Sequence, residues 1–144
     1  MTFTPTRLQE AVTPALVLDQ EKLARNVLRM HTTLARHRVV ERPHVKTVKC
    51  VEAARLAFPG RGTGPITVST LAEADHFAAH GFRDVTYAVG LAPVKLPRLR
   101  DLVRLGCAVN VILDSPEATT RVWRKNGCFE AIEAYYDQVL VVGA

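Results

Sequence analysis

Residues 66–89, ITVSTLAEADHFAAHGFRDVTYAV, contain one complete strand–helix–strand repeat. Ile66–Ser69 is a short apolar run of the kind found in buried strands. Thr70 predicts the N-cap of a helix, because Glu73 occupies the capping-box position three residues later. Val85–Val89 then predicts a second strand. A strand, a helix and a further apolar strand within so few residues indicate a parallel βαβ unit.

The same alternation extends outward from this segment in both directions. The expected elements are strands at 13–19, 39–47, 66–69, 85–89 and 108–113, and helices that begin near Asp19, Cys50, Thr70, Pro93 and Asp114. Near-continuous apolar strands separated by helices predict a parallel sheet. Periodicity alone leaves two architectures open, a doubly wound sheet and part of a (β/α) barrel.

Composition sets the class of protein. With 144 residues and 48% hydrophobic content, residues 1–144 suit a single domain with a packed core. The net charge of +5 is scattered along the chain rather than gathered into a basic run. Apolar stretches fall far short of the roughly 18 residues that a membrane span needs. Cys50, Cys107 and Cys128 are an odd set without a CxxC pair or a preceding signal segment, which predicts a reduced, cytoplasmic protein.

Both architectures place their functional sites at the carboxyl ends of the parallel strands. Of these ends, only Lys46-Thr47 offers a strong nucleophile. A lysine at a buried strand end, with Lys49 nearby, would have a lowered pKa and would favour the free amine that attacks an aldehyde. Periodicity alone favours the alternative that Lys46 and Lys49 are two surface cations at a strand-to-helix turn.

The segment around this lysine carries a family resemblance. Arg42-Pro43-His44-Val45-Lys46-Thr47, followed by Lys49-Cys50, resembles the Arg-Pro-His-x-Lys-Thr-His-Lys signature of the D-threonine aldolase and D-serine dehydratase family. The segments 13–19, 66–74 and 87–95 resemble that family in the same order. The resemblance covers about residues 13–118 and implies a partial TIM-type (β/α) barrel of the alanine racemase N-terminal type, with parallel strands alternating with helices.

The resemblance also implies a cofactor and a reaction. In that family the matching lysine binds pyridoxal 5'-phosphate as a Schiff base, which assigns this role to Lys46, with His44 and Arg42 expected at the cofactor-binding wall. The implied activity is that of a lyase that cleaves D-3-hydroxy amino acids or dehydrates D-serine, and racemisation is a variant. Val48 stands where the family has a second histidine, which puts any proton relay through that imidazole in doubt.

The remaining length departs from the family pattern. Full-length relatives have an eight-stranded barrel and a further β domain, so the resemblance implies an amino-terminal part. Their phosphate-binding groups and divalent metal ligands would lie beyond Ala144. Residues 119–144 are expected to be a divergent tail with a helix at 129–136 and a strand at Val139–Val142. Open strand edges of a partial barrel favour a homo-oligomer.

Two alternative hypotheses are that the chain is a non-catalytic barrel remnant or a basic binding module. His76 and His80 lie four residues apart on a predicted helix, but they lack a third ligand, so no metal is assigned. Gly60–Gly64 precedes a strand rather than a helix and is interpreted as a connecting turn. The basic helix is interpreted as a solvated face, and neither nucleic acid nor a membrane is expected as a partner; its basic residues are Lys95, Arg98, Arg100 and Arg104.

Overall fold

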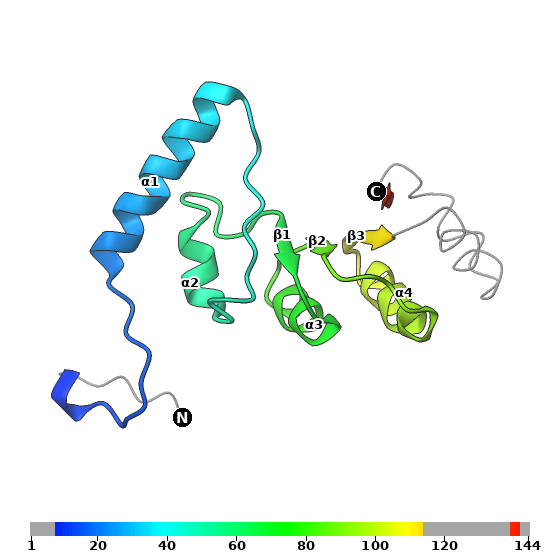
Figure 1. Cartoon of the computed structure of the whole chain (residues 1–144), viewed down its shortest axis with the longest axis horizontal. Helices are drawn as coiled ribbons and strands as arrows, with labels where there is room; N and C mark the ends of the chain where they lie inside the picture. Colours follow the sequence, from blue (N-terminus) through cyan, green and yellow to red (C-terminus); the bar gives the residue numbers. More distant parts are fainter. Residues whose placement is uncertain (1–7, 114–138, 142–144) are drawn as a thin grey trace.

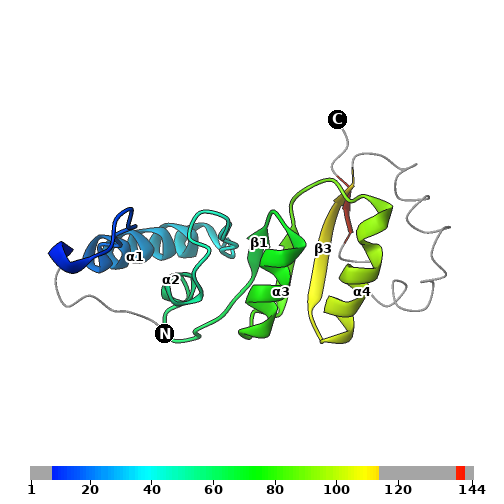
Figure 2. The same ribbon diagram turned by 90° about the horizontal axis from the view of Figure 1, so that it is seen from below.

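The computed structural model describes residues 8–113 and 139–141, which include a four-stranded parallel sheet ordered β1-β2-β3-β4. In chain order the elements are η1 (Leu8–Glu10), α1 (Gln20–His37), α2 (Val51–Leu56), β1 (Ile66–Val68), α3 (Leu71–Ala79), β2 (Asp84–Tyr87), η2 (Pro93–Lys95), α4 (Leu96–Arg104), β3 (Ala108–Leu113) and β4 (Val139–Val141). Figure 1 shows α3 and α4 on the same face of the sheet. Figure 2 shows α1 and α2 at the end of the molecule remote from α4.

The two helices expected from their capping residues form as predicted. The side chain of Asp19 accepts a hydrogen bond from the backbone N–H of Lys22 at the start of α1. At α3, Thr70 and Glu73 form a reciprocal capping box. These local bonds satisfy backbone donors that a helix leaves unpaired at its N-terminus, so short sequence motifs suffice to position both helix starts.

The hydrophobic core lies between the sheet and the helices. Phe77 of α3 is completely buried, and its ring meets the ring of Phe82 edge to face, with centroids 5.3 Å apart and planes at 88°. Phe58 contacts Phe82 in a similar geometry, with centroids 6.1 Å apart. The aromatic cluster ties the end of α2 to α3 and so holds the helices against one sheet face.

The strand register separates a buried face from a polar face. Ile66 pairs with Val85 and Val68 pairs with Tyr87, and all four side chains are buried in the core. The intervening position of β2, Thr86, lies between Thr67 of β1 and Asn110 of β3 and is partly exposed. Since successive side chains point to opposite faces, these polar residues lie on the face away from the core.

A polar second face distinguishes the two architectures left open by periodicity. A doubly wound sheet carries helices on both faces and has strands that are apolar throughout. In the described part of the chain, α3 and α4 cover one face, and the other presents Thr67, Thr86 and Asn110. This arrangement is that of a segment of barrel wall, with helices outside and a polar interior.

The first two predicted strands are the part of the fold that the structure corrects. Residues 13–19 form no strand, and Leu16 and Val17 are exposed. Residues 39–47 make only an isolated parallel bridge, in which the Val45 N–H donates to the Thr67 carbonyl and the Thr67 N–H to the Pro43 carbonyl, both at 2.9 Å. A strand needs a neighbour for its backbone groups, and the described residues offer none to residues 13–19.

Of the elements predicted near the carboxyl terminus, the two strands are present and the two helices cannot be compared. The strand predicted at 108–113 is present as β3, and the one predicted at Val139–Val142 is present as β4, which pairs in parallel with β3. The helix starting at Asp114 and the helix at 129–136 lie outside the described residues. The single domain over 1–144 and the divergent tail at 119–144 therefore stay predictions.

Gly64 gives a test of how closely the core is packed. A Cβ atom added at Gly64 would overlap Cε1 of Phe58, a ring that is itself buried. We expect Gly64→Ala to lower the free energy of unfolding by about 1–3 kcal/mol, because the ring has to move within a packed core. Urea denaturation measures the change. Gly90→Ala is the matched control, since nothing lies within 4 Å of its added Cβ, and equal losses for both variants would contradict the packing.

Candidate functional site

A cluster of polar side chains lies where the segment ending at Val45 and strand β1 both finish. His44 and Lys46 come from the first of these, and Ser69 directly follows β1. Glu73 enters from the first turn of α3. Because parallel neighbours end at the same edge of the sheet, residues about 25 positions apart in sequence meet here, as the contact between His44 and Ser69 shows.

His44 is bound through both of its ring nitrogens. Nδ1 accepts a hydrogen bond from the backbone N–H of Lys46 at 3.2 Å, and Nε2 lies 3.2 Å from the hydroxyl oxygen of Ser69. Burial is the main cause that lowers the pKa of His44 below its ordinary value, the positive charge of Lys46 lowers it further, and Glu73 acts in the opposite direction. The structure thus favours an uncharged imidazole beside the lysine.

Glu73 organises the opposite side of the cluster. Its Oε2 atom accepts hydrogen bonds from the backbone N–H groups of Ser69, at 2.8 Å, and Thr70, at 3.3 Å. Its Oε1 atom lies 3.9 Å from Nζ of Lys49, and its side chain is only 11% exposed. The carboxylate of Glu73 therefore lies at the N-terminus of α3, where it satisfies two backbone donors.

Lys46 itself lies in the turn that follows buried Val45, and it is exposed. The expectation that burial would desolvate this lysine is wrong for the described residues, because none of them covers this side of the turn. The expected repulsion from Lys49 is also offset, since Lys49 lies near the carboxylate of Glu73. The amine is accessible to a ligand from solvent, at the position that the sequence predicted.

Arg42 does not join this cluster. Its guanidinium makes a two-pronged ion pair with Asp84, with Nη1–Oδ1 and Nη2–Oδ2 distances of 2.7 and 3.0 Å. Asp84 is the first residue of β2, so this pair lies at the amino end of the sheet. The structure brings His44 to Lys46 and holds Arg42 at the other end, where its position gives no support to the expected cofactor contact.

Ser69, Glu73 and Asp84 were not among the predicted site residues. Asp84 and Thr86 both contact the side-chain amide of Asn110, each at 3.4 Å. Asp84 and Thr86 alternate with apolar residues in β2, and this sequence pattern places both side chains on one face of the sheet. Ser69 was recognised as a strand end, yet its contact with His44 depends on which strands are neighbours.

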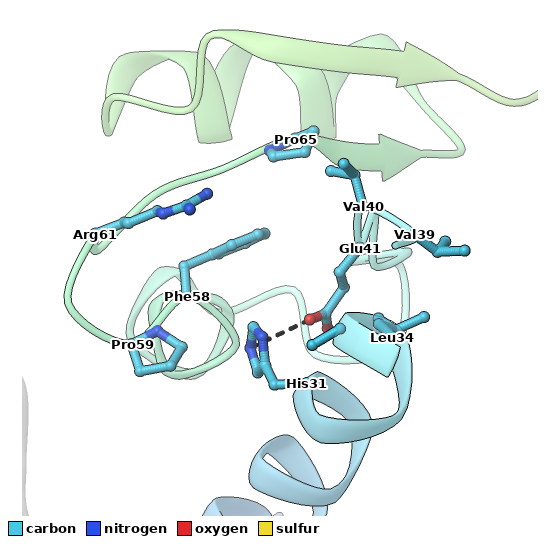
Figure 3. A pocket seen from close by; sticks show the side chains of 10 residues that line it. His31, Leu34, Val39, Val40, Glu41, Phe58, Pro59, Arg61 and Pro65 are labelled. Carbon is cyan, nitrogen blue, oxygen red and sulfur yellow. Dashed lines mark ion pairs between the residues drawn. The ribbon is translucent and has the colours of Figure 1, made fainter. Parts of the chain in front are cut away.

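A pocket of about 300 Å³ lies elsewhere, between α1 and the segment leading into β1. Figure 3 shows His31 and Glu41 facing each other across it, with Nε2 and Oε2 3.2 Å apart, while Phe58 and Pro65 form part of its wall. Nε2 of His31 also lies 2.9 Å from the carbonyl oxygen of Ala57. Pro65 immediately precedes β1, so this pocket is on the amino side of the sheet. None of the predicted site residues lines it.

The weaker candidates make contacts within the described part of the chain. The rings of His76 and His80 are 4.8 Å apart, but Nδ1 of His80 lies 2.7 Å from the carbonyl oxygen of His76. Within residues 8–113 and 139–141, no three His, Cys, Asp or Glu side chains are grouped so that they could hold a metal. On the basic helix, Arg98 forms an ion pair with Asp75. Among the described helices, none is both long and apolar enough to span a membrane.

Comparison with known proteins supplies the family context. No protein-family model matches the chain. The D-threo-3-hydroxyaspartate dehydratase of Delftia sp. strain HT23 is 44% identical over 110 residues, covering 76% of this chain and 29% of that protein. A D-threonine aldolase of Arthrobacter sp. is 34% identical over 113 residues, again covering 76% of this chain and 29% of the relative. The chain thus spans less than a third of the length of these relatives.

A solved structure shows which type of fold the chain has. The crystal structure of an alanine racemase-like protein from Idiomarina loihiensis matches 96% of this chain with a TM-score of 0.77 and 32% identity, and 36% of that protein is covered. Together with the polar inner face of the sheet, this likeness confirms a partial barrel of the alanine racemase type with parallel strands alternating with helices.

Proposed function

We propose that this chain is part of a pyridoxal-phosphate-dependent lyase acting on D-amino acids. It matches the amino-terminal portion of proteins of the D-threonine aldolase and D-serine dehydratase family. Lys46 is the residue that we propose binds the cofactor. The observation that carries the proposal is the position of Lys46 at the carboxyl end of the barrel wall, directly beside a histidine whose ring is favoured in its neutral form.

The residues around Lys46 fit the aldehyde end of pyridoxal phosphate. An uncharged amine is the form that condenses with an aldehyde, and a neutral imidazole adds no positive charge beside it. The cofactor supplies the electron sink for cleavage next to the substrate's α-carbon. Because Glu73 occupies the N-terminus of α3, we do not assign the cofactor's phosphate to this helix.

Each residue of the cluster has a defined part in this proposal. The ε-nitrogen of Lys46 would hold the cofactor and would be the nearest group to accept a proton from the substrate. His44 supports the backbone of Lys46 through its Nδ1 atom, while its Nε2 atom is bound to Ser69. Glu73 lies close to Lys49, so its carboxylate offsets a charge that would otherwise repel an ammonium group near the site.

The substrate class follows from the relatives. The matched proteins are named as a dehydratase of D-threo-3-hydroxyaspartate and an aldolase of D-threonine. Both names describe a D-amino acid with a hydroxyl group on its β-carbon, and we propose this class for the present chain. We also propose a cytoplasmic location and association of copies. Free thiols at Cys50 and Cys107 support the former, and the position of β4 at the sheet's edge among the described strands supports the latter.

A second candidate is a barrel segment without catalytic activity. The exposure of Lys46 favours this candidate, because a working site normally excludes water from its nucleophile. Racemisation at the same lysine would need the same cofactor, and it differs from lyase activity only in the products formed.

Titration with pyridoxal phosphate separates these candidates. We expect the purified chain to develop a visible absorbance band, and borohydride reduction followed by peptide mass mapping to find the label on Lys46. Product analysis with D-threonine and D-3-hydroxyaspartate then distinguishes cleavage, dehydration and racemisation. A label spread evenly over exposed lysines such as Lys22 and Lys49, or no absorbance band, would overturn the proposal and leave the non-catalytic segment.

A further inference from the structure

The hydrogen bonds of His44 define its protonation state. A ring nitrogen that accepts a hydrogen bond carries no proton, and Nδ1 accepts from the backbone N–H of Lys46. A neutral imidazole then has its single proton on Nε2, which donates to the hydroxyl oxygen of Ser69 at 3.2 Å. The geometry therefore selects one of two possible neutral tautomers.

The Ser69 hydroxyl is held where it can accept the hydrogen bond from Nε2 of His44. Its backbone N–H donates to Oε2 of Glu73 at 2.8 Å, and its residue follows directly after β1. The carboxylate of Glu73 is in turn anchored by the capping box of α3. Ser69 is thus tied to both the strand and the helix, so its position does not depend on Lys46 or on the turn that carries it.

We propose that Ser69 is a positioning residue for Lys46, acting by holding His44 in the tautomer whose Nδ1 atom binds the Lys46 backbone. Protonation of His44 would place a proton on Nδ1 facing that N–H, and the bond that shapes the turn would be lost. This chain of contacts makes the presentation of Lys46 sensitive to pH. The role of the turn in presenting a cofactor-binding amine rests on the proposed function, whereas the hydrogen-bond arrangement does not.

The direction of the pH effect follows from the charges that face His44. These are Lys46 on its own turn and Glu73 on α3, with Lys49 near the same carboxylate. Burial and Lys46 hold the pKa of His44 below the ordinary value of 6.5 against the opposing effect of Glu73. As the pH falls through 6.5, an unfolded chain takes up its proton first, so stability falls and the ordered turn is retained best above this pH.

Nuclear magnetic resonance on nitrogen-labelled protein tests the proposal without any cofactor. In the unaltered chain we expect Nε2 of His44 to be protonated and Nδ1 bare. In Ser69→Ala we expect a mixture of tautomers and amide exchange at Lys46 that is about five- to tenfold faster, as when one ordinary hydrogen bond is lost. Ser69→Thr keeps a hydroxyl and should restore both the single tautomer and the slow exchange.

The controls separate this inference from the proposed function. Thr86→Val removes a hydroxyl on the same sheet face that contacts Asn110, and it should leave His44 and the Lys46 amide unchanged. An unaltered tautomer and unaltered Lys46 exchange in Ser69→Ala would overturn the positioning role. Failure of Lys46 to bind pyridoxal phosphate, with the resonance results as expected, would overturn only the proposed function.

Discussion

Replacement of Lys46 by alanine is expected to abolish covalent binding of pyridoxal phosphate. Only this side chain combines the matched motif, the carboxyl end of the barrel wall and contact through its backbone with His44. The turn is formed by residues 45–48, and Lys46 is the one residue among these four whose side chain has an amine that can condense with the aldehyde. Absorbance titration and borohydride trapping should therefore show label on the unaltered chain and only background on Lys46→Ala.

Two further variants make this result specific to the amine. Lys49→Ala removes a neighbouring exposed lysine that lies 3.9 Å from Glu73, and it should keep the label at Lys46. Lys46→Arg keeps a positive charge and the turn, but a guanidinium stays protonated and does not condense with the aldehyde, so it should lose the label as alanine does. Retention of the label in Lys46→Ala, or its loss in Lys49→Ala, would contradict the assignment.

Among the variants considered for stability, replacement of Phe77 by alanine is expected to lower the free energy of unfolding most. Its ring is completely buried and contacts Phe82 edge to face, so the change removes both apolar burial and an aromatic contact. Phe→Ala changes in cores lower the free energy of unfolding by about 3–5 kcal/mol. Against a typical total of about 5–15 kcal/mol for a domain, such a loss leaves a substantial fraction of molecules unfolded under mild conditions.

The measurement is urea denaturation followed by circular dichroism, with Leu105→Ala as the control. Leu105 is 65% exposed at the end of α4, and its replacement should change the free energy of unfolding by no more than about 0.5 kcal/mol. A similar small change for Phe77→Ala would show that the ring is not packed as the structure places it.

Much of the local structure was predictable from short motifs. The N-cap at Asp19, the capping box of Thr70 and Glu73, and the apolar run of β3 depend on residues within a few positions of one another. Such interactions are written in contiguous sequence, and the corresponding elements are present. The strand expected at 13–19 failed because a strand also requires a neighbour, which no local pattern supplies.

By itself, the sequence determined the alternation of strands and helices and the parallel sheet. It also determined that Lys46 lies at the carboxyl end of the segment that precedes α2. Its family resemblance, confirmed by the relatives, determined the type of barrel.

Only the tertiary structure decided which side chains surround that lysine. The register between segments brought Ser69 to His44, 25 residues away, and paired Arg42 with Asp84, 42 residues away. It also left Lys46 exposed. The physical reason is that burial and side-chain contacts depend on which strands are neighbours and which faces are covered, and neither is encoded within one stretch of sequence.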